Sequence, residues 1–223
     1  MSGFMVLLKR EIQLSLRQAG DFAAGLTFFL LPPFLFALGS GLGAAFDITQ
    51  SLAMVSLTFM LALISGLDRL LRGDWQSGWF DILRLRPPQL ILAVWAKIAA
   101  FVLLSGVPMI LMAPLILKFF YAQNFALADL CAVTPVLLLF AVNLSILGMM
   151  IGSLSLGARM APTLIFILLL PLSVPLFIFT IAAGTAILQE QAWFPALSVL
   201  LAFFMAAAMV CPVITAYIIK HLD

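Results

Sequence analysis

The sequence predicts an all-α, polytopic membrane protein with six transmembrane helices. Hydrophobic residues make up 65% of its 223 positions and charged residues only 9%, and the mean hydropathy is +1.25. A soluble domain is about 45–50% apolar and about 25% charged, and a soluble fold of this length has too little interior to bury the excess. Long uncharged stretches and a one-sided distribution of basic residues support the same fold class.

The first predicted element is an amphipathic helix over 4–18 that lies along the membrane without crossing it. Its apolar face carries Met5, Leu8, Ile12 and Leu16, and its neighbouring polar face carries Lys9, Gln13 and Arg17. This pattern is typical of an interfacial helix; a frayed polar tail is the alternative. The first apolar run is too short for a signal peptide, and it precedes the charges instead of following them.

Six stretches then have the roughly 20 mostly apolar residues that a helix needs to cross the hydrocarbon core. They are 22–43, 48–67, 98–117, 130–154, 162–188 and 195–219. None of them contains Asp, Glu, Lys or Arg. That absence is expected, because a charge near mid-membrane costs on the order of 2.5–3.5 kcal/mol.

The basic residues lie almost entirely on one side of these spans. Both termini and the connections 67–97 and 155–161 fall on that side and carry ten of the 11 Lys and Arg residues, whereas only Lys118 falls on the other. An excess of Lys and Arg in short loops marks the cytoplasmic side. We therefore predict that both termini are cytoplasmic.

The connection 67–97 concentrates charge in a short segment. Seven charged residues lie within 68–86, although the whole chain has only twenty (11 Lys and Arg plus 9 Asp and Glu). A Gly-Asp pair predicts a helix start and two prolines predict its stop, which gives a helix over 73–86. Gly78 weakens that helix by about 1 kcal/mol relative to Ala, which allows a bend there.

Two interpretations of this helix stay open from the residues alone. Trp75 and Trp79 share one helical stripe with Arg86 and with Ile82 or Leu83. Tryptophans are typical of the membrane–water interface, but Trp and Arg are also enriched in protein-binding hot spots. The segment is therefore either an interfacial helix or a docking helix for a cytoplasmic partner.

Two segments resemble the heme exporter B subunit family, CcmB, of the cytochrome c maturation system. They are LDRLLRGDWQSGWFDILRLRPPQLILAVWAK at 67–97 and LLLPLSVPLFIF at 168–179. The amphipathic N-terminal helix, the six spans and the charged helix between spans two and three are similar to the membrane subunits of ABC-2-type exporters, and the resemblance covers essentially the whole chain. One departure is Ser77, where the family commonly has an acidic residue, so a salt bridge at that position is in doubt.

The resemblance implies the transmembrane (permease) subunit of an ABC transporter in the bacterial inner membrane. In the family, the segment that matches 78–85 is the coupling helix, which sits in a cleft of a separate cytoplasmic ATPase subunit. The aromatic residues are then anchors and the charged residues polar contacts. The implied docking residues are Trp75, Gly78, Trp79, Phe80, Asp81, Arg84 and Arg86.

The resemblance also implies the partners of the chain. They are the ABC ATPase, a heme-handling C subunit, a small D subunit, a periplasmic heme chaperone that is loaded and released, and a second copy of this chain within the membrane lipid. No nucleic acid is expected. ATP is expected on the ATPase subunit, and heme is expected to be handled by the complex.

The chain itself is not expected to be an enzyme or to hold a cofactor or metal. It has no GxxxxGK[ST] loop for the phosphates of ATP. Heme iron takes axial ligands from His, Met, Cys or Tyr, and the only histidine, His221, lies two residues from the end of the sequence. Cys131 and Cys211 have no metal-ligand spacing and are expected to stay unpaired. We therefore predict that the chain transmits force; passage of heme along an apolar groove without ligation stays open.

Small and polar residues within the spans have a packing explanation beside a functional one. The pairs Gly39/Gly43 and Gly148/Gly152 have the GxxxG spacing that lets helices approach closely, either within one chain or between two. Asn143 is expected to form an interhelical hydrogen bond and not a substrate contact.

An exporter of the same architecture for another lipid-like or amphipathic cargo is the main alternative. A secondary transporter or channel usually has ionisable groups at mid-membrane, and the six predicted spans have no Asp, Glu, Lys or Arg. An intramembrane enzyme needs a catalytic set such as Ser/His or paired Asp on facing spans, and the spans contain no such set.

Overall fold

The computed structural model describes residues 3–17, 19–41, 46–84, 87–121, 125–156 and 161–221, and within these ranges the chain is helical with short connections and no strand. The helices are α1 (Gly3–Leu16), α2 (Ala19–Gly39), α3 (Ile48–Gln76), α4 (Trp79–Arg84), α5 (Pro87–Phe101), α6 (Val107–Ile116), α7 (Leu127–Cys131), α8 (Thr134–Leu154), α9 (Ala161–Leu188) and α10 (Phe194–His221). Two π-helical turns, η1 (Val102–Gly106) and η2 (Leu117–Tyr121), continue α5 and α6. The predicted all-α class is therefore confirmed for the described part of the chain.

Five of the described helices are long and apolar enough to cross a membrane. They are Ile48–Gln76, Gln89–Phe119, Leu127–Leu154, Thr163–Leu188 and Phe194–His221. The apolar part of α2, Ala23–Gly39, is shorter. Five of the six predicted spans thus have a matching helix. The remaining one, the first span along the chain at α2, stays a prediction.

The second and third spans belong to helices that extend well beyond the predicted boundaries. The 29 residues of α3 correspond to about 43 Å at 1.5 Å per residue, compared with roughly 30 Å of hydrocarbon. The third apolar stretch was expected to begin at 98, but its helix already begins at Pro87. Only α4 and two short connections therefore join α3 to α5.

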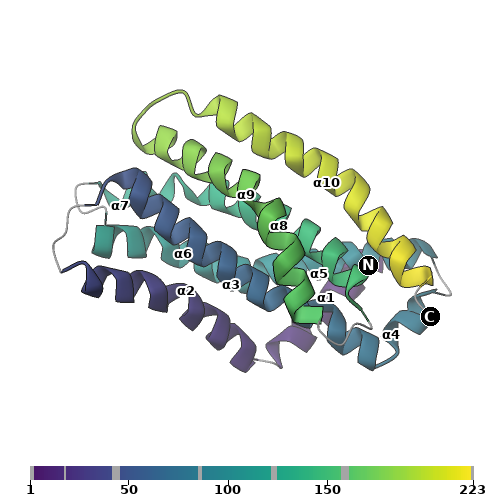
Figure 1. The fold of residues 1–223 in the computed structure, drawn as a ribbon. Helices are drawn as coiled ribbons and strands as arrows, with labels where there is room; N and C mark the ends of the chain where they lie inside the picture. Colours follow the sequence, from purple (N-terminus) through teal and green to yellow (C-terminus); the bar gives the residue numbers. More distant parts are fainter. Residues whose placement is uncertain are drawn as a thin grey trace.

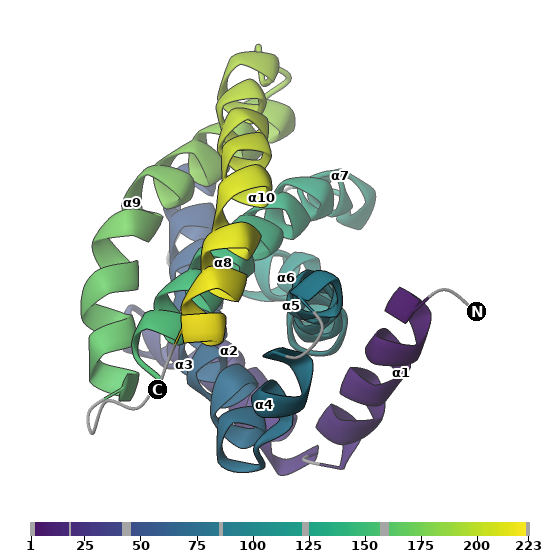
Figure 2. The same cartoon turned by 90° about the vertical axis from the view of Figure 1, so that its right-hand side faces the viewer.

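The helices form an elongated bundle in which both termini and α4 lie at one end (Figure 1). At the opposite end lie α7 and the connection between α9 and α10 (Figure 1). Seen along the bundle, α1 runs across its axis beside α5 (Figure 2). The end that holds the termini and α4 is called the charged end below, because it contains the ion pairs described in the next section.

Helix α8 packs against α3 through its GxxxG pair. A Cβ atom at Gly148 would overlap Leu67 Cδ1 and would lie 2.9 Å from Leu67 Cδ2, and one at Gly152 would lie 3.1 Å from Leu71 Cδ1. The two glycines therefore serve a helix contact within this chain. Of the other pair, Gly43 lies outside the described residues.

The interhelical hydrogen bond predicted for Asn143 is confirmed. Its side-chain amide donates to the carbonyl of Leu139 at 3.0 Å and to that of Leu200, in α10, at 3.3 Å. Because Asn143 is fully buried, this bond ties α8 to α10 in the interior. Cys131 and Cys211 are both free, as predicted.

Candidate functional site

The break between α3 and α4 falls at Gly78 and not at the predicted Gly73–Asp74 position. Helix α3 runs through Gly73 and Asp74, and Ser77 closes it by donating its N–H to the carbonyl of Gly73 at 3.1 Å. Gly78 follows with φ +70°, a left-handed conformation that glycine adopts without steric cost. The structure thus has a break at Gly78, where the sequence allows a bend. The helix start predicted at 73–74 is wrong, because Asp74 lies inside α3 and its side chain forms ion pairs instead of capping a helix.

Helix α4 has an inward apolar face and an outward face. Phe80 and Leu83 are 2% and 3% exposed and pack into the core at the charged end, whereas Ile82 is 60% exposed and Asp81 is also exposed. Phe80 was expected to be an anchor for the partner, but its burial shows that it anchors α4 to this chain. A surface contact at α4 therefore has to use the outward residues.

Of the two tryptophans in the predicted docking set, Trp75 lies near the end of α3 and Trp79 begins α4. Trp75 and Trp79 are partly buried against the same core. Arg84 ends α4, but its side chain lies outside the described part, as does the whole of Arg86. The aromatic residues therefore serve packing within the chain as well as any surface role.

Four charged side chains form a closed ring beside α4. Lys97 Nζ of α5 lies 2.8 Å from Glu11 Oε2 of α1 and also pairs with Asp74 Oδ2 of α3. Arg10 of α1 pairs with Asp74 Oδ1 at 2.9 Å and with Glu11. Each charge thus lies between two opposite charges, and the ring Arg10–Glu11–Lys97–Asp74 joins three helices.

The ring is largely withdrawn from solvent. The side chains of Lys97 and Asp74 are 2% exposed, that of Glu11 is 6% exposed and that of Arg10 is 29% exposed. Burial alone would lower the pKa of Arg10, but the hydrogen bond and charge of Asp74, with the charge of Glu11, raise that pKa above its ordinary value. Buried ions of this kind are tolerated only with opposite partners in good geometry.

Arg10 extends the ring to α4. The guanidinium carbon lies 4.0 Å from the centroid of the Trp79 ring, within the range of a cation–π contact. The Trp79 Nε1 atom is buried without a hydrogen-bond partner among the described residues. The indole is therefore held by its faces and not by its N–H group.

The sequence reasoning missed this ring. The helical pattern over 4–18 placed Lys9 and Arg17 on the polar face, and both are exposed, but it did not assign Arg10 and Glu11. A usable signal was Glu11, because an acidic residue beside the apolar face of an otherwise basic segment needs a partner once it is buried.

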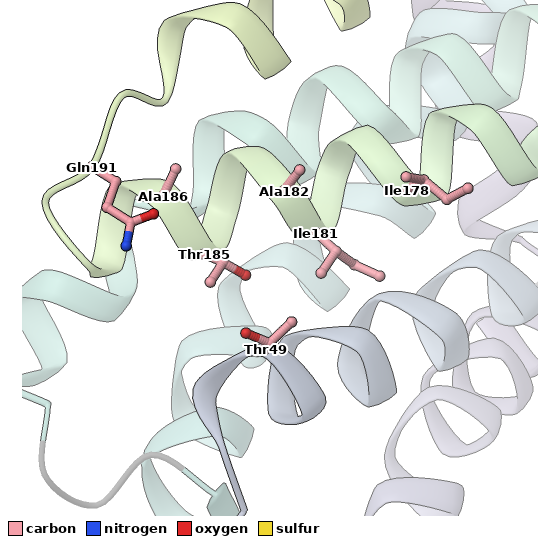
Figure 3. A pocket seen from close by; sticks show the side chains of 7 residues that line it. All are labelled: Thr49, Ile178, Ile181, Ala182, Thr185, Ala186 and Gln191. Atoms are coloured by element: carbon pink, nitrogen blue, oxygen red, sulfur yellow. The ribbon is translucent and has the colours of Figure 1, made fainter.

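Two cavities lie at the opposite end of the bundle. One of about 400 Å³ lies between α3 and α9, where Thr49 and Thr185 point toward one another (Figure 3). It is lined by Thr49, Ile178, Ile181, Ala182, Thr185, Ala186 and Gln191. The other, of about 420 Å³, is lined by Phe36, Phe46, Gln50, Ala53, Met54, Leu57 and Phe177. Among the described residues that line these two cavities, only Met54 has a side chain that can ligate heme iron.

The family model and the individual relatives that match this chain all belong to one protein family. The model of the family described as "CcmB protein" matches residues 2–221. A protein of Pseudomonas aeruginosa called heme exporter protein B is 34% identical over 190 residues, which cover 83% of this chain and 82% of the relative. Proteins of the same name are 29% identical in Bradyrhizobium diazoefficiens, over 99% of both chains, and in Escherichia coli K12, over 82% of both.

Proposed function

We propose, from the premise that this chain belongs to the CcmB protein family, that it couples ATP hydrolysis by a separate cytoplasmic ABC ATPase to heme delivery. The matching relatives are heme exporter B proteins, and the chain is a membrane subunit of a heme export system. Their names favour heme over another lipid-like or amphipathic cargo.

The observation that carries the coupling proposal is the placement of α4. It is a six-residue helix at the charged end, with Asp81 and Ile82 on its outward face. Two residues separate it from α3 and two from α5. With connections this short, a force applied to α4 passes to both long helices, which is the mechanical role of a coupling helix.

The proposed docking surface differs from the sequence-based set in one respect. Asp81 and Ile82, both exposed on α4, form its centre. Trp75 and Trp79, both partly buried, stay in the proposed set, as do Arg84 and Arg86, whose side chains lie outside the described residues. Phe80 is removed because it is buried in the chain's own core. The two long helices then move with α4 when the ATPase moves.

The other partners follow from family membership. We propose that the complex contains the C and D subunits and a second copy of this chain, and that it loads and releases a periplasmic heme chaperone. We also propose that it lies in the bacterial inner membrane with both termini in the cytoplasm. The basic residues of α1 and of the α3–α5 connection support that orientation.

Ile82→Glu tests the docking surface. Burial of a charge at the centre of an interface should weaken ATPase binding by at least about 30-fold, the effect of losing a hot spot of about 2 kcal/mol. Ile82 is 60% exposed, so membrane insertion and melting of the chain should be unchanged. Gln13→Glu, which adds the same charge at an exposed position of α1, is the matched control.

Co-purification of the ATPase and chaperone release are the two measurements. Ile82→Glu should lose both, and Gln13→Glu should keep both. Wild-type ATPase binding by Ile82→Glu at normal expression would refute the assignment of α4 as the docking helix.

A further inference from the structure

We propose that Arg10 is a positioning residue that sets the orientation of α4, and that the ring Arg10–Glu11–Lys97–Asp74 makes α1, α4 and the adjoining ends of α3 and α5 one rigid body. The ring is a property of this chain alone. Its consequence for transport, that α1 moves with α4, rests on the proposed function.

The ring is one cooperative unit and not two independent salt bridges. Lys97 contacts both carboxylates, and Arg10 contacts both as well. Removal of one charge therefore leaves the three remaining side chains with a buried net charge. Removal of two adjacent, opposite charges leaves one neutral ion pair. The alternation of sign around the ring is thus the feature that fixes the three helices relative to one another.

The short helix α4 needs such external support. Isolated helices shorter than about 12–15 residues are marginal in water, and α4 has six residues. Phe80 and Leu83 hold its inward face, with Trp79 partly buried against the same core, but apolar contacts are non-directional and by themselves define the rotation of the helix about its own axis only weakly. The contact between Arg10 and Trp79 fixes that rotation, because a planar guanidinium stacks on an indole in a defined orientation.

Alternation of charge is tested by a set of four variants in the full chain. Lys97→Met leaves two carboxylates with one cation, and we expect it to lower the melting midpoint by roughly 5–15 °C. The double variant Glu11→Gln/Lys97→Met leaves the neutral pair of Arg10 and Asp74, and its midpoint should fall less. Lys9→Met removes an exposed lysine of α1 and should leave the midpoint unchanged.

The charge swap Glu11→Lys/Lys97→Glu, the fourth variant, separates the ring from an isolated pair. In a ring the swap places Lys beside Arg10 and Glu beside Asp74, so the midpoint should stay low. In an isolated pair the swap would restore attraction and with it the wild-type midpoint. Restoration by the swap would therefore overturn the ring.

The orientation of α4 is measured without any ATPase. Spin labels at Gln13 and Ile82, both exposed, in a chain whose cysteines are replaced by serine, report the distance between α1 and α4. Arg10→Lys keeps the charge but loses the planar stack, so the distance distribution should broaden while the melting midpoint changes little. Arg17→Lys, the same change at an exposed position, should leave the distribution as in the wild type.

Two variants of the indole keep this proposal testable if Arg10→Lys fails to fold. Trp79→Phe retains an aromatic face and should keep the narrow distribution, whereas Trp79→Leu should broaden it. Equal distributions in Arg10→Lys and Arg17→Lys, or in Trp79→Phe and Trp79→Leu, would overturn the positioning role. If Arg10→Lys broadens the distribution while the wild-type chain never binds an ATPase, the positioning role of Arg10 is supported and the proposed function is refuted.

Discussion

Replacement of Gly148 by alanine tests the contact between α8 and α3, against which α3 has to move if it transmits force. A Cβ atom at Gly148 would overlap Leu67 Cδ1 and would lie 2.9 Å from Cδ2 and 3.0 Å from Cγ of the same side chain. Leu67 is 2% exposed, so its branched end cannot move away without displacing other core residues. The clash therefore involves a whole isobutyl group.

The size of the effect follows from two opposed contributions. Alanine in a helix interior is favoured over glycine by about 1 kcal/mol, whereas overpacking of a filled core costs about 1–3 kcal/mol. Three atoms of Leu67 are in conflict, which places the overpacking at the upper end of that range. We expect a net destabilisation of about 1–2 kcal/mol, or a melting midpoint lower by roughly 2–8 °C for a chain of this size.

Thermal melting of the purified chain in detergent is the assay, with Gly73→Ala as the matched control. Gly73 lies inside α3 and is exposed, and a Cβ atom added there would meet no neighbouring atom within 4 Å, so alanine should raise the midpoint. Leu67→Ala should largely relieve the Gly148→Ala defect, so the double variant should lose less than the sum of the single ones. Equal shifts for Gly148→Ala and Gly73→Ala would refute the close contact between α8 and α3.

Three further outcomes are expected. A cysteine at Gln50 should be labelled from the periplasm and one at Gln76 from the cytoplasm; periplasmic labelling at Gln76 would invert the proposed topology. His221→Ala and Met54→Leu should both leave heme loading of the chaperone intact at normal protein levels, because neither residue is proposed to ligate iron, and complete loss in either would identify a missed ligand. Gly78→Ala should lower the melting midpoint by roughly 2–8 °C, since a non-glycine residue at φ +70° costs about 1–2 kcal/mol; an unchanged midpoint would show that the turn tolerates other conformations.

Much of the fold could be predicted because a membrane span is a long stretch of apolar, uncharged residues, which is visible in the sequence without knowledge of any tertiary contact. The apolar stretches correspond to the cores of α3, α8, α9 and α10, and the bend at Gly78 follows from the local chemistry of glycine. The extent of α3 could not be predicted in the same way. Charged residues after position 67 indicated where the chain leaves the hydrocarbon core. The helix itself can continue beyond the core into water, so the charges did not indicate where α3 ends.

The candidate site was less predictable because its organising contacts are long-range. Glu11 and Lys97 are 86 positions apart and Arg10 and Asp74 are 64 apart, and a helical periodicity carries no information about such a pairing. Phe80 was misplaced for a related reason. A run of aromatic residues on a charged segment does not reveal which of them turns toward the core, since that depends on where α3 ends.

The separation of the ring partners has a consequence for biosynthesis. A ribosome that adds about 5–20 residues per second needs roughly 4–17 s to proceed from Glu11 to Lys97. Asp74 of α3 is made before Lys97, but the ring stays incomplete, with Glu11 lacking its partner from α5, until Lys97 has been added. Docking of α1 therefore has to follow the synthesis of α5, and a nascent chain that stops before Lys97 should expose its N-terminal helix to proteases that spare the full-length protein.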